Sequence, residues 1–348
     1  MLNTLIAATN PFRFNLTWPT ITFGEWATVI LILSLGLLSA LELRVPKEKW
    51  SAKSIRQSYK TNFSLFIFNS LIMSLLSAVS LPLLAKHNSG HGLLSNIADP
   101  TSKAVLAFLA LDFLLYVWHK ASHSFDYLWR FHRVHHNDPS LNVSTGFRVH
   151  VVELFIIHIL KAVLIIAMGM SQMMVLTNEL VMTLFIMFHH TNISFKGEKW
   201  LGLMIIVPYL HRTHHSTERA EHDSNYGAVL SVWDRIFGTL SELEPAGIGI
   251  KCSSPLDFVN LLKFGFTLQT PPILQPMNLQ LMIAEAAYYK AEKRNFYPGY
   301  ELDDWLEAEK EILSMVYIGR KVQEKPRHKI QCSYLNWLHF PMRLDFRN

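Results

Sequence analysis

The chain has 348 residues, half of them hydrophobic and only 17% charged. Soluble domains are about a quarter charged, so this composition, with a mean hydropathy of +0.19, favours an integral membrane protein. The net charge of +5 comes without a zinc-finger, RNP or basic-stripe pattern, which argues against nucleic-acid binding. Cys252 and Cys332 are far apart and form no CxxC, so they indicate neither a disulfide framework nor an iron–sulfur site.

Apolar runs predict an all-α polytopic membrane bundle. Residues 22–41 and 63–84 are long enough to span a bilayer, whereas 104–118 spans only if its helix continues into the histidine-rich region that follows. The run 151–188 has Gly169 and Ser171 near its middle and predicts a helical hairpin, and a shorter apolar run covers 200–210. The N-terminus lacks a basic segment before an apolar core, so we expect no cleaved signal peptide.

Charge predicts the orientation of the bundle. The 42–61 loop is rich in basic residues, whereas the segment before it offers only Arg13, so the positive-inside rule places this loop in the cytoplasm. Two further crossings return the chain to the cytoplasm after residue 118, and the 151–188 hairpin goes in and returns. All the histidine clusters are therefore expected in a helical cap on the cytoplasmic face.

Three histidine clusters dominate the sequence. Thirteen of the 17 histidines lie between positions 119 and 222, in one HxxxH and two HxxHH patterns. Imidazole is the commonest protein ligand for transition metals, and spacings of three and four place side chains on one face of a helix. The eight clustered histidines are too many for one ion and suit a pair; they are His119, His123, His132, His135, His136, His211, His214 and His215.

The histidine patterns are compatible with three kinds of metal site. The first is a binuclear non-haem iron site that activates dioxygen. The second is a bis-histidine haem, which leaves the doublets His135-His136 and His214-His215 unexplained. The third is a zinc or manganese site in a membrane hydrolase or a metal transporter, which ligand type alone does not exclude.

The chain resembles the fatty acid hydroxylase/sterol desaturase superfamily of membrane di-iron enzymes. The resemblance covers about residues 25–240 and rests on motifs in the order of the family, which are Glu42 and Pro46, His119 to His123, Arg130 to His136, Arg148 to Glu153, Phe188 to Asn192, His211 to His215, Asp223 to Gly227 and Trp233 to Thr239. It implies two iron ions, with zinc as a substitute in purified protein, and O2 as co-substrate. It also implies hydroxylation or desaturation of a lipid, such as a sterol or fatty acyl chain, in lipid biosynthesis.

The resemblance also implies the ligand set. The metal-binding role carries to the eight clustered histidines and to His190. Members of the family often have glutamine at the place of His189, so either of the paired histidines fits as ligand. His150, His189 and His222 are further candidates as ligands or as groups that orient ligands, and Glu153 and Asp223 are candidates to accept hydrogen bonds from ligand N–H groups.

The electron donor is expected to be a separate protein. The sequence has no CxxCH, no His-Pro-Gly-Gly and no Rossmann glycines, so a ferredoxin, cytochrome or reductase is implied. An arginine-rich surface near the clusters is predicted to recruit an acidic donor; it comprises Arg130, Arg133, Arg212 and Arg219.

The chain changes character after the membrane domain, which we place at 1–245. Residues 246–276, with three prolines, are predicted to be a linker, and 321–348 a basic-aromatic tail. Between them, 277–320 is predicted to form two helices joined by a turn at Asn295 to Gly299, and it resembles a small bacterial helical domain of unknown function. The expected location is therefore a bacterial inner membrane.

Overall fold

The computed structural model describes residues 22–76, 80–250, 254–267 and 276–321, in which the regular elements are all helices. The described chain forms two compact units: the first extends to Gly265, and the second begins at Phe266. The all-α prediction is therefore confirmed.

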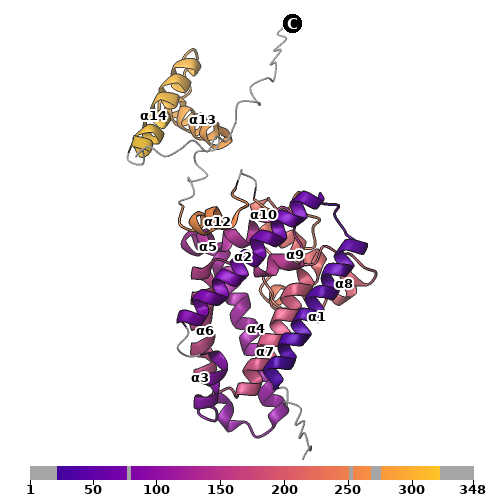
Figure 1. Cartoon of the computed structure of the whole chain (residues 1–348). Helices are drawn as coiled ribbons and strands as arrows, with labels where there is room; N and C mark the ends of the chain where they lie inside the picture. The colour runs from indigo at the N-terminus through magenta and orange to yellow at the C-terminus, as the bar shows by residue number, and fades with distance from the viewer. Residues whose placement is uncertain (1–21, 77–79, 251–253, 268–275, 322–348) are drawn as a thin grey trace, which may run out of the picture. The chain divides into compact units, whose positions relative to one another are not determined.

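Within the described residues, four helices are long and apolar enough to cross a membrane. They are α1 (Phe23–Arg44), α4 (Pro100–Ser124), α6 (Val151–Met168) and α7 (Gln172–His189) (Figure 1). The α4 helix continues without interruption from its apolar part into His119 and His123, which is the condition that the sequence set for this span. A membrane helix of the bundle therefore carries two of the predicted ligand histidines at its own end.

The second predicted span, 63–84, does not form one continuous helix in the described residues. Helix α2 (Ala52–Leu76) begins well before residue 63 and is not among the helices apolar enough to cross, and a separate helix α3 (Leu81–Asn88) follows. The reason lies in a polar stripe: the buried side chains of Ser58, Asn62 and Asn69 face the rest of the protein, and Asn69 donates to the Val149 carbonyl at 2.8 Å. The connection between the first two helices is shorter than the predicted 42–61 loop, because α1 extends to Arg44 and α2 starts at Ala52.

The predicted hairpin at 151–188 is confirmed as α6 and α7. Gly169 ends α6 in a left-handed conformation with φ of +68°, and Ser171 caps α7 by accepting from the Met174 amide. A side chain at Gly169 would collide with Gly92, whose backbone nitrogen lies 2.9 Å from the position of the missing Cβ. This tight turn fixes the end of the bundle opposite to the histidines.

Short helices gather at the other end of the bundle. Figure 1 shows α5, α9, α10 and α12 together at the end away from α3. The short elements are α5 (Asp126–His136), α8 (Glu198–Leu201), α9 (Pro208–His214), α10 (Arg219–His222), α11 (Val232–Ile236), α12 (Phe258–Phe264) and the 3-10 turn η2 (Val143–Phe147), whereas η1 (Leu93–Asn96) follows α3. These short elements, without η1, form a cap on the end of the bundle where α1, α4 and α7 finish.

Buried carboxylates attach this cap to the membrane helices. Glu42 in α1 accepts from the backbone amides of Val143 and Asn192, both at 2.7 Å. These bonds tie the end of α1 to η2 and to the segment that follows α7. A buried backbone amide without a partner is costly, so one glutamate fixes two loops of the cap.

Asp112 performs the same role on α4. Its carboxylate is fully buried and accepts from the amides of Val229 and Leu230 at 2.9 and 3.2 Å and from the Trp233 indole at 2.8 Å. Asp234 in turn accepts from the Tyr226 and Gly227 amides at 2.8 Å. The 226–234 loop is thereby pinned beside the histidine end of α4.

The predicted linker contains a short helix, and the predicted hairpin forms the second unit. Helix α12, within 246–276, packs its Leu261 against Leu65 and Val134. The second unit consists of α13 (Pro276–Lys293) and α14 (Glu301–Lys321), which is the expected helix–turn–helix. Its buried apolar core comprises Ile283, Ala287, Ala308 and Ile312. The predicted tail lies outside the described residues apart from Lys321.

Candidate metal centre

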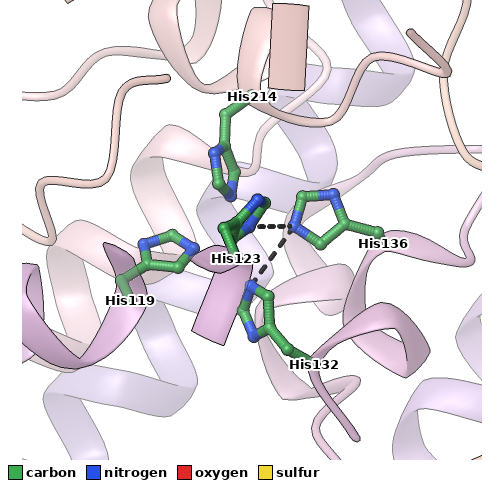
Figure 2. A group of neighbouring side chains, drawn as sticks. All are labelled: His119, His123, His132, His136 and His214. Atoms are coloured by element: carbon green, nitrogen blue, oxygen red, sulfur yellow. Dashed lines mark hydrogen bonds between the residues drawn. The ribbon is translucent and has the colours of Figure 1, made fainter. Parts of the chain in front are cut away.

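Five histidines converge at the junction of α4, α5 and α9. Their nearest ring nitrogens all lie within 4.8 Å of one another, and Figure 2 shows the imidazoles pointing inward; they are His119, His123, His132, His136 and His214. The Nε2 atom of His136 is 3.1 Å from that of His123 and 3.2 Å from that of His132. Nitrogens that share one ion at bond lengths near 2.1 Å are about 3 Å apart, so these separations suit a common ion.

Four further histidines form a second group beside the first. Nε2 of His190 lies 3.1 Å from that of His135 and 3.0 Å from that of His211, and Nε2 of His215 lies 3.2 Å from that of His211. The two groups adjoin, since the rings of His136 and His215 stack with centroids 4.5 Å apart. Together the groups contain the nine histidines that the sequence proposed as metal ligands.

The helical period explains how each HxxHH motif divides between the groups. Residues four apart share a face of a helix, whereas adjacent residues point about 100° apart. His132 and His136 on α5 therefore enter the five-histidine group, and His135 turns to the four-histidine group. On the α9 segment the arrangement is reversed: His211 and His215 join the second group and His214 the first.

Hydrogen bonds orient several of these rings through their outer nitrogen. Nδ1 of His132 pairs with Glu153 at 2.7 Å and Nδ1 of His123 with Asp223 at 3.1 Å, the two carboxylates expected to play this part. Three more rings are fixed by backbone carbonyls, namely His119 by Tyr226, His190 by Ile186 and His214 by Ser224. An imidazole that donates from Nδ1 presents Nε2 as its free lone pair, which is the form that binds a metal.

Unpartnered nitrogens show that the pocket suits a cation. Nε2 of His119 and of His214 are buried without a hydrogen-bond partner among the described residues, although a buried polar atom normally has one. Burial, followed by the neighbouring imidazoles, lowers the pKa of His136 and of His215 well below the usual range. The rings are thus neutral donors, and a bound ion would satisfy the unpartnered nitrogens.

The remaining candidate histidines lie around the groups. His189 is buried with its ring 4.1 Å from that of His211, but its neighbour His190 is the one in the four-histidine group. His150 caps α6, and its Nε2 faces the Leu262 carbonyl at 3.1 Å, outside both groups. His222 shares a smaller, partly exposed cluster with His123 and Asp223.

Two aromatic residues complete the wall of the five-histidine group. Tyr226, whose motif the sequence singled out, lies 5.1 Å from the His123 ring and 5.6 Å from the His119 ring. Trp129, which sequence reasoning missed, stacks on His222 at 5.1 Å and lies 4.9 Å from His123. The only available signal was its position three residues before His132, one helical turn away on α5.

The predicted arginine surface is wrong for two of its four members. Arg133 is buried, with its guanidinium 3.9 Å above the Phe264 ring and a bond to the Phe264 carbonyl. Arg212 is also buried and donates to the Ile193 carbonyl at 3.1 Å. Both are structural because they sit on the inner faces of the short helices. Arg219 is exposed and pairs with Asp223 at 3.1 Å.

Comparison with known proteins finds a family that the site region resembles. Residues 104–239, which carry all nine histidines of the two groups, match the family model described as fatty acid hydroxylase. The chain is therefore similar to the fatty acid hydroxylase family over the region that holds the histidine groups. Residues 279–314 match a separate model described as a protein of unknown function, in agreement with the expected helical appendage. No solved structure matches the chain significantly.

Several curated relatives are lipid-modifying proteins by name. Human alkylglycerol monooxygenase is 32% identical over 46% of this chain and 35% of its own length. Ornithine lipid hydroxylase OlsE of Rhizobium tropici is 25% identical over 62% of this chain and 66% of its own length. Human cholesterol 25-hydroxylase is 28% identical over 39% of this chain and 50% of its own length. The chain thus spans between about a third and two thirds of the length of these three relatives.

Proposed function

We propose that this protein is a membrane di-iron oxygenase that hydroxylates a lipid. The observation that carries the proposal is the pair of adjoining, buried histidine groups, with five and four inward nitrogens. One ion in each group would be held by neutral imidazoles, with Glu153 and Asp223 orienting two of the rings. The named relatives, a monooxygenase and two hydroxylases, favour hydroxylation over desaturation.

Two bound iron ions would supply the redox chemistry of the net reaction RH + O2 + 2e⁻ + 2H⁺ → ROH + H2O. The residues of the chain would do the rest. The buried walls, including Tyr226, keep water from the reacting carbon, and the fixed rings leave little freedom to the ligands. The position of the substrate relative to the centre would select the carbon that reacts.

An apolar groove on the membrane face offers a place for the lipid chain. It has a volume of about 380 Å³ and is lined by residues of η1, α4 and α6 together with Trp233. Phe113, one of the lining residues, and His119 are six residues apart on α4, which corresponds to about 9 Å of helix rise. A chain lying in the groove would therefore point along α4 toward the five-histidine group.

Electrons would come from a separate donor, such as a ferredoxin, cytochrome or reductase. The exposed Arg219 side chain pairs with Asp223, the C-cap residue of α10, and Asp223 reaches Nδ1 of His123, so these contacts connect the surface at α10 to the five-histidine group. We propose this edge, together with Arg130, as the docking side, in place of the four-arginine surface. We also propose that it faces the cytoplasm of a bacterial inner membrane, as the charge of the α1–α2 connection indicates.

The test is oxygen-dependent turnover by purified, iron-loaded protein. Membranes that contain the protein, supplied with a reductant and labelled O2, should yield a lipid that carries one labelled oxygen atom. A zinc hydrolase would act without O2 and incorporate oxygen from water. A metal transporter would move ions across vesicles and give no new lipid, so the label distinguishes all three.

A further inference from the structure

A second cavity lies in the cap, away from the apolar groove. It has a volume of about 270 Å³ and is lined mainly by polar residues from the start of α2 and from the segment after α5, together with Arg148, which follows η2. Ser51, Lys53 and Ser54 lie at the N-terminus of α2, a helix of 25 residues. A helix N-terminus favours anions because its first amides have no partner within the helix and its dipole is positive there.

The inner wall of this cavity holds an incompletely satisfied cation. Arg148 is only 1% exposed, lines the cavity, and has no hydrogen-bond partner for Nε or Nη2 among the described residues. Its Nη1 donates to Asn62 at 3.2 Å and lies 3.4 Å from Asp138. Because buried arginine donors are costly when unpaired, the guanidinium calls for a further acceptor.

Asp138, the acidic residue of the lining, is already fully used. Its Oδ2 accepts from Ser58, Asn62 and Thr145 at 2.7, 3.0 and 2.8 Å. The negative charge of Asp138 is balanced by the positive charge of Arg148. Among the residues that line the cavity, this leaves the positive charge of Lys53 unbalanced. The electrostatic balance is thus positive, with hydroxyl donors around it.

From this arrangement we propose that the cavity binds a phosphate group, and that in the membrane this phosphate is carried by the headgroup of the lipid substrate. The second half of the proposal rests on the proposed function. A phosphate with its four oxygens can use the first α2 amides, the Ser51 hydroxyl, Lys53 and the free donors of Arg148 together. The Ser54 amide already donates to Ser51 Oγ at 3.1 Å, and the Ser54 hydroxyl pairs with that of Ser140. The volume admits a phosphate or a phosphoglycerol but not an acyl chain.

The position of the cavity supports a headgroup rather than a soluble ligand. Asp138 is two residues beyond His136, so the wall of the cavity and the five-histidine group are built from one continuous segment. The outer lining residues Ser51 and Lys53 are exposed, at the end of the bundle where the membrane helices α1 and α4 finish. A phosphate held there would place a lipid with its head in the cap and its chain directed into the bundle.

The test is titration of the full chain in an uncharged detergent and a chloride buffer by calorimetry. The probes are inorganic phosphate, short-chain phosphatidic acid and short-chain phosphatidylcholine. The wild-type protein should bind phosphatidic acid at least about tenfold more tightly than inorganic phosphate. Ser54→Asp, which adds a negative charge to the cavity, should weaken both by about tenfold or more, and Lys53→Gln should weaken both less.

Lys60→Gln is the matched control because Lys60 is exposed on the same helix outside the cavity, and its binding should stay within about twofold of wild type. Arg148 is left intact because removing it would strand buried Asp138. Absence of binding by the wild type, or equal binding by Ser54→Asp with an unchanged melting temperature, overturns the site. Equal affinities for phosphate and phosphatidic acid overturn the headgroup assignment.

Lys53→Gln keeps the test decisive if Ser54→Asp does not fold. Iron content is measured on the same samples, so failure of the two proposals can be told apart. A protein that takes up no iron but binds phosphate contradicts the oxygenase proposal and leaves the cavity supported. A protein that loads iron but binds neither phosphate probe overturns the cavity and leaves the oxygenase proposal supported.

Discussion

Nδ1 of His132 lies 2.7 Å from Oε1 of Glu153, and both side chains are buried. The glutamate comes from the first turn of α6, whereas the histidine lies on α5, so this contact joins a membrane helix to the cap. A carboxylate that accepts from the outer nitrogen of an imidazole holds the ring in one tautomer and increases its basicity. The pair therefore couples the packing of α6 to the five-histidine group.

Replacing Glu153 with glutamine should weaken metal retention. The amide keeps the shape of the side chain but removes its charge, and we expect metal affinity to fall by about 10- to 100-fold with little loss of helix content. Metal loss to a chelator, followed with time, measures the effect. Glu285→Gln on the exposed face of α13 is the control and should behave as wild type; similar retention by both variants would argue against an orienting role for Glu153.

Replacing each of the two adjacent histidines at the end of α7 should affect the metal content of the protein differently. His190 belongs to the four-histidine group, so His190→Gln should lower the metal content toward one ion per chain. His189→Gln should keep both ions, because His189 contacts the group without joining it. Metal analysis of the two purified variants decides between them, and loss of metal in His189→Gln alone would reverse the assignment.

Asp112 should matter for folding rather than chemistry. Asp112→Asn turns an amide group toward the Val229, Leu230 and Trp233 donors, and each donor left unsatisfied costs about 1–3 kcal/mol. We expect a clearly lower melting temperature and a loss of metal, since the 226–234 loop also holds His119 through the Tyr226 carbonyl. Asp99→Asn, at the N-cap of the same helix, should be nearly neutral, because asparagine is an equally good N-cap.

The metal-free protein should lose stability in mild acid. Burial lowers the pKa of His135, His211 and His214 well below the ordinary value in the folded state, whereas the unfolded chain titrates near 6.5. Below about pH 6.5 the unfolded state therefore binds more protons than the folded state, and the free energy of unfolding falls as pH falls. Melting temperatures between pH 7.5 and 5.5 check this; a flat profile would contradict neutral, buried imidazoles.

The sequence anticipated which histidines come together better than it anticipated the helices of the bundle. Ligand spacing on α5 and α9 is a local property, so the HxxHH patterns were visible without the fold. What was not visible is the division of each motif between two groups, because it depends on how α5 and α9 face each other. The sequence alone also did not show which of His189 and His190 joins the four-histidine group. That choice depends on the end of α7, where His189 is the last helical residue and His190 the C-cap.

The errors have a common physical cause. The sequence predicted one helix at 63–84 because hydropathy averages over Asn69, whose polar side chain turns inward and donates to the Val149 carbonyl just before α6. Arg133 and Arg212 were assigned to the surface because charge usually lies there, yet both donate to backbone carbonyls in the cap. The roles of Asp112 and Asp234 could not be predicted, since the 226–234 loop that they hold meets α4 only in the folded chain.

The central claim is that the two histidine groups hold a pair of iron ions. The most direct measurement is metal content with Mössbauer spectroscopy on detergent-purified protein, expressed with iron and kept anaerobic. We predict about two irons per chain, one for each histidine group, with spectra that change when O2 is admitted. Zinc alone, with no iron uptake and no response to oxygen after reconstitution, would contradict this claim.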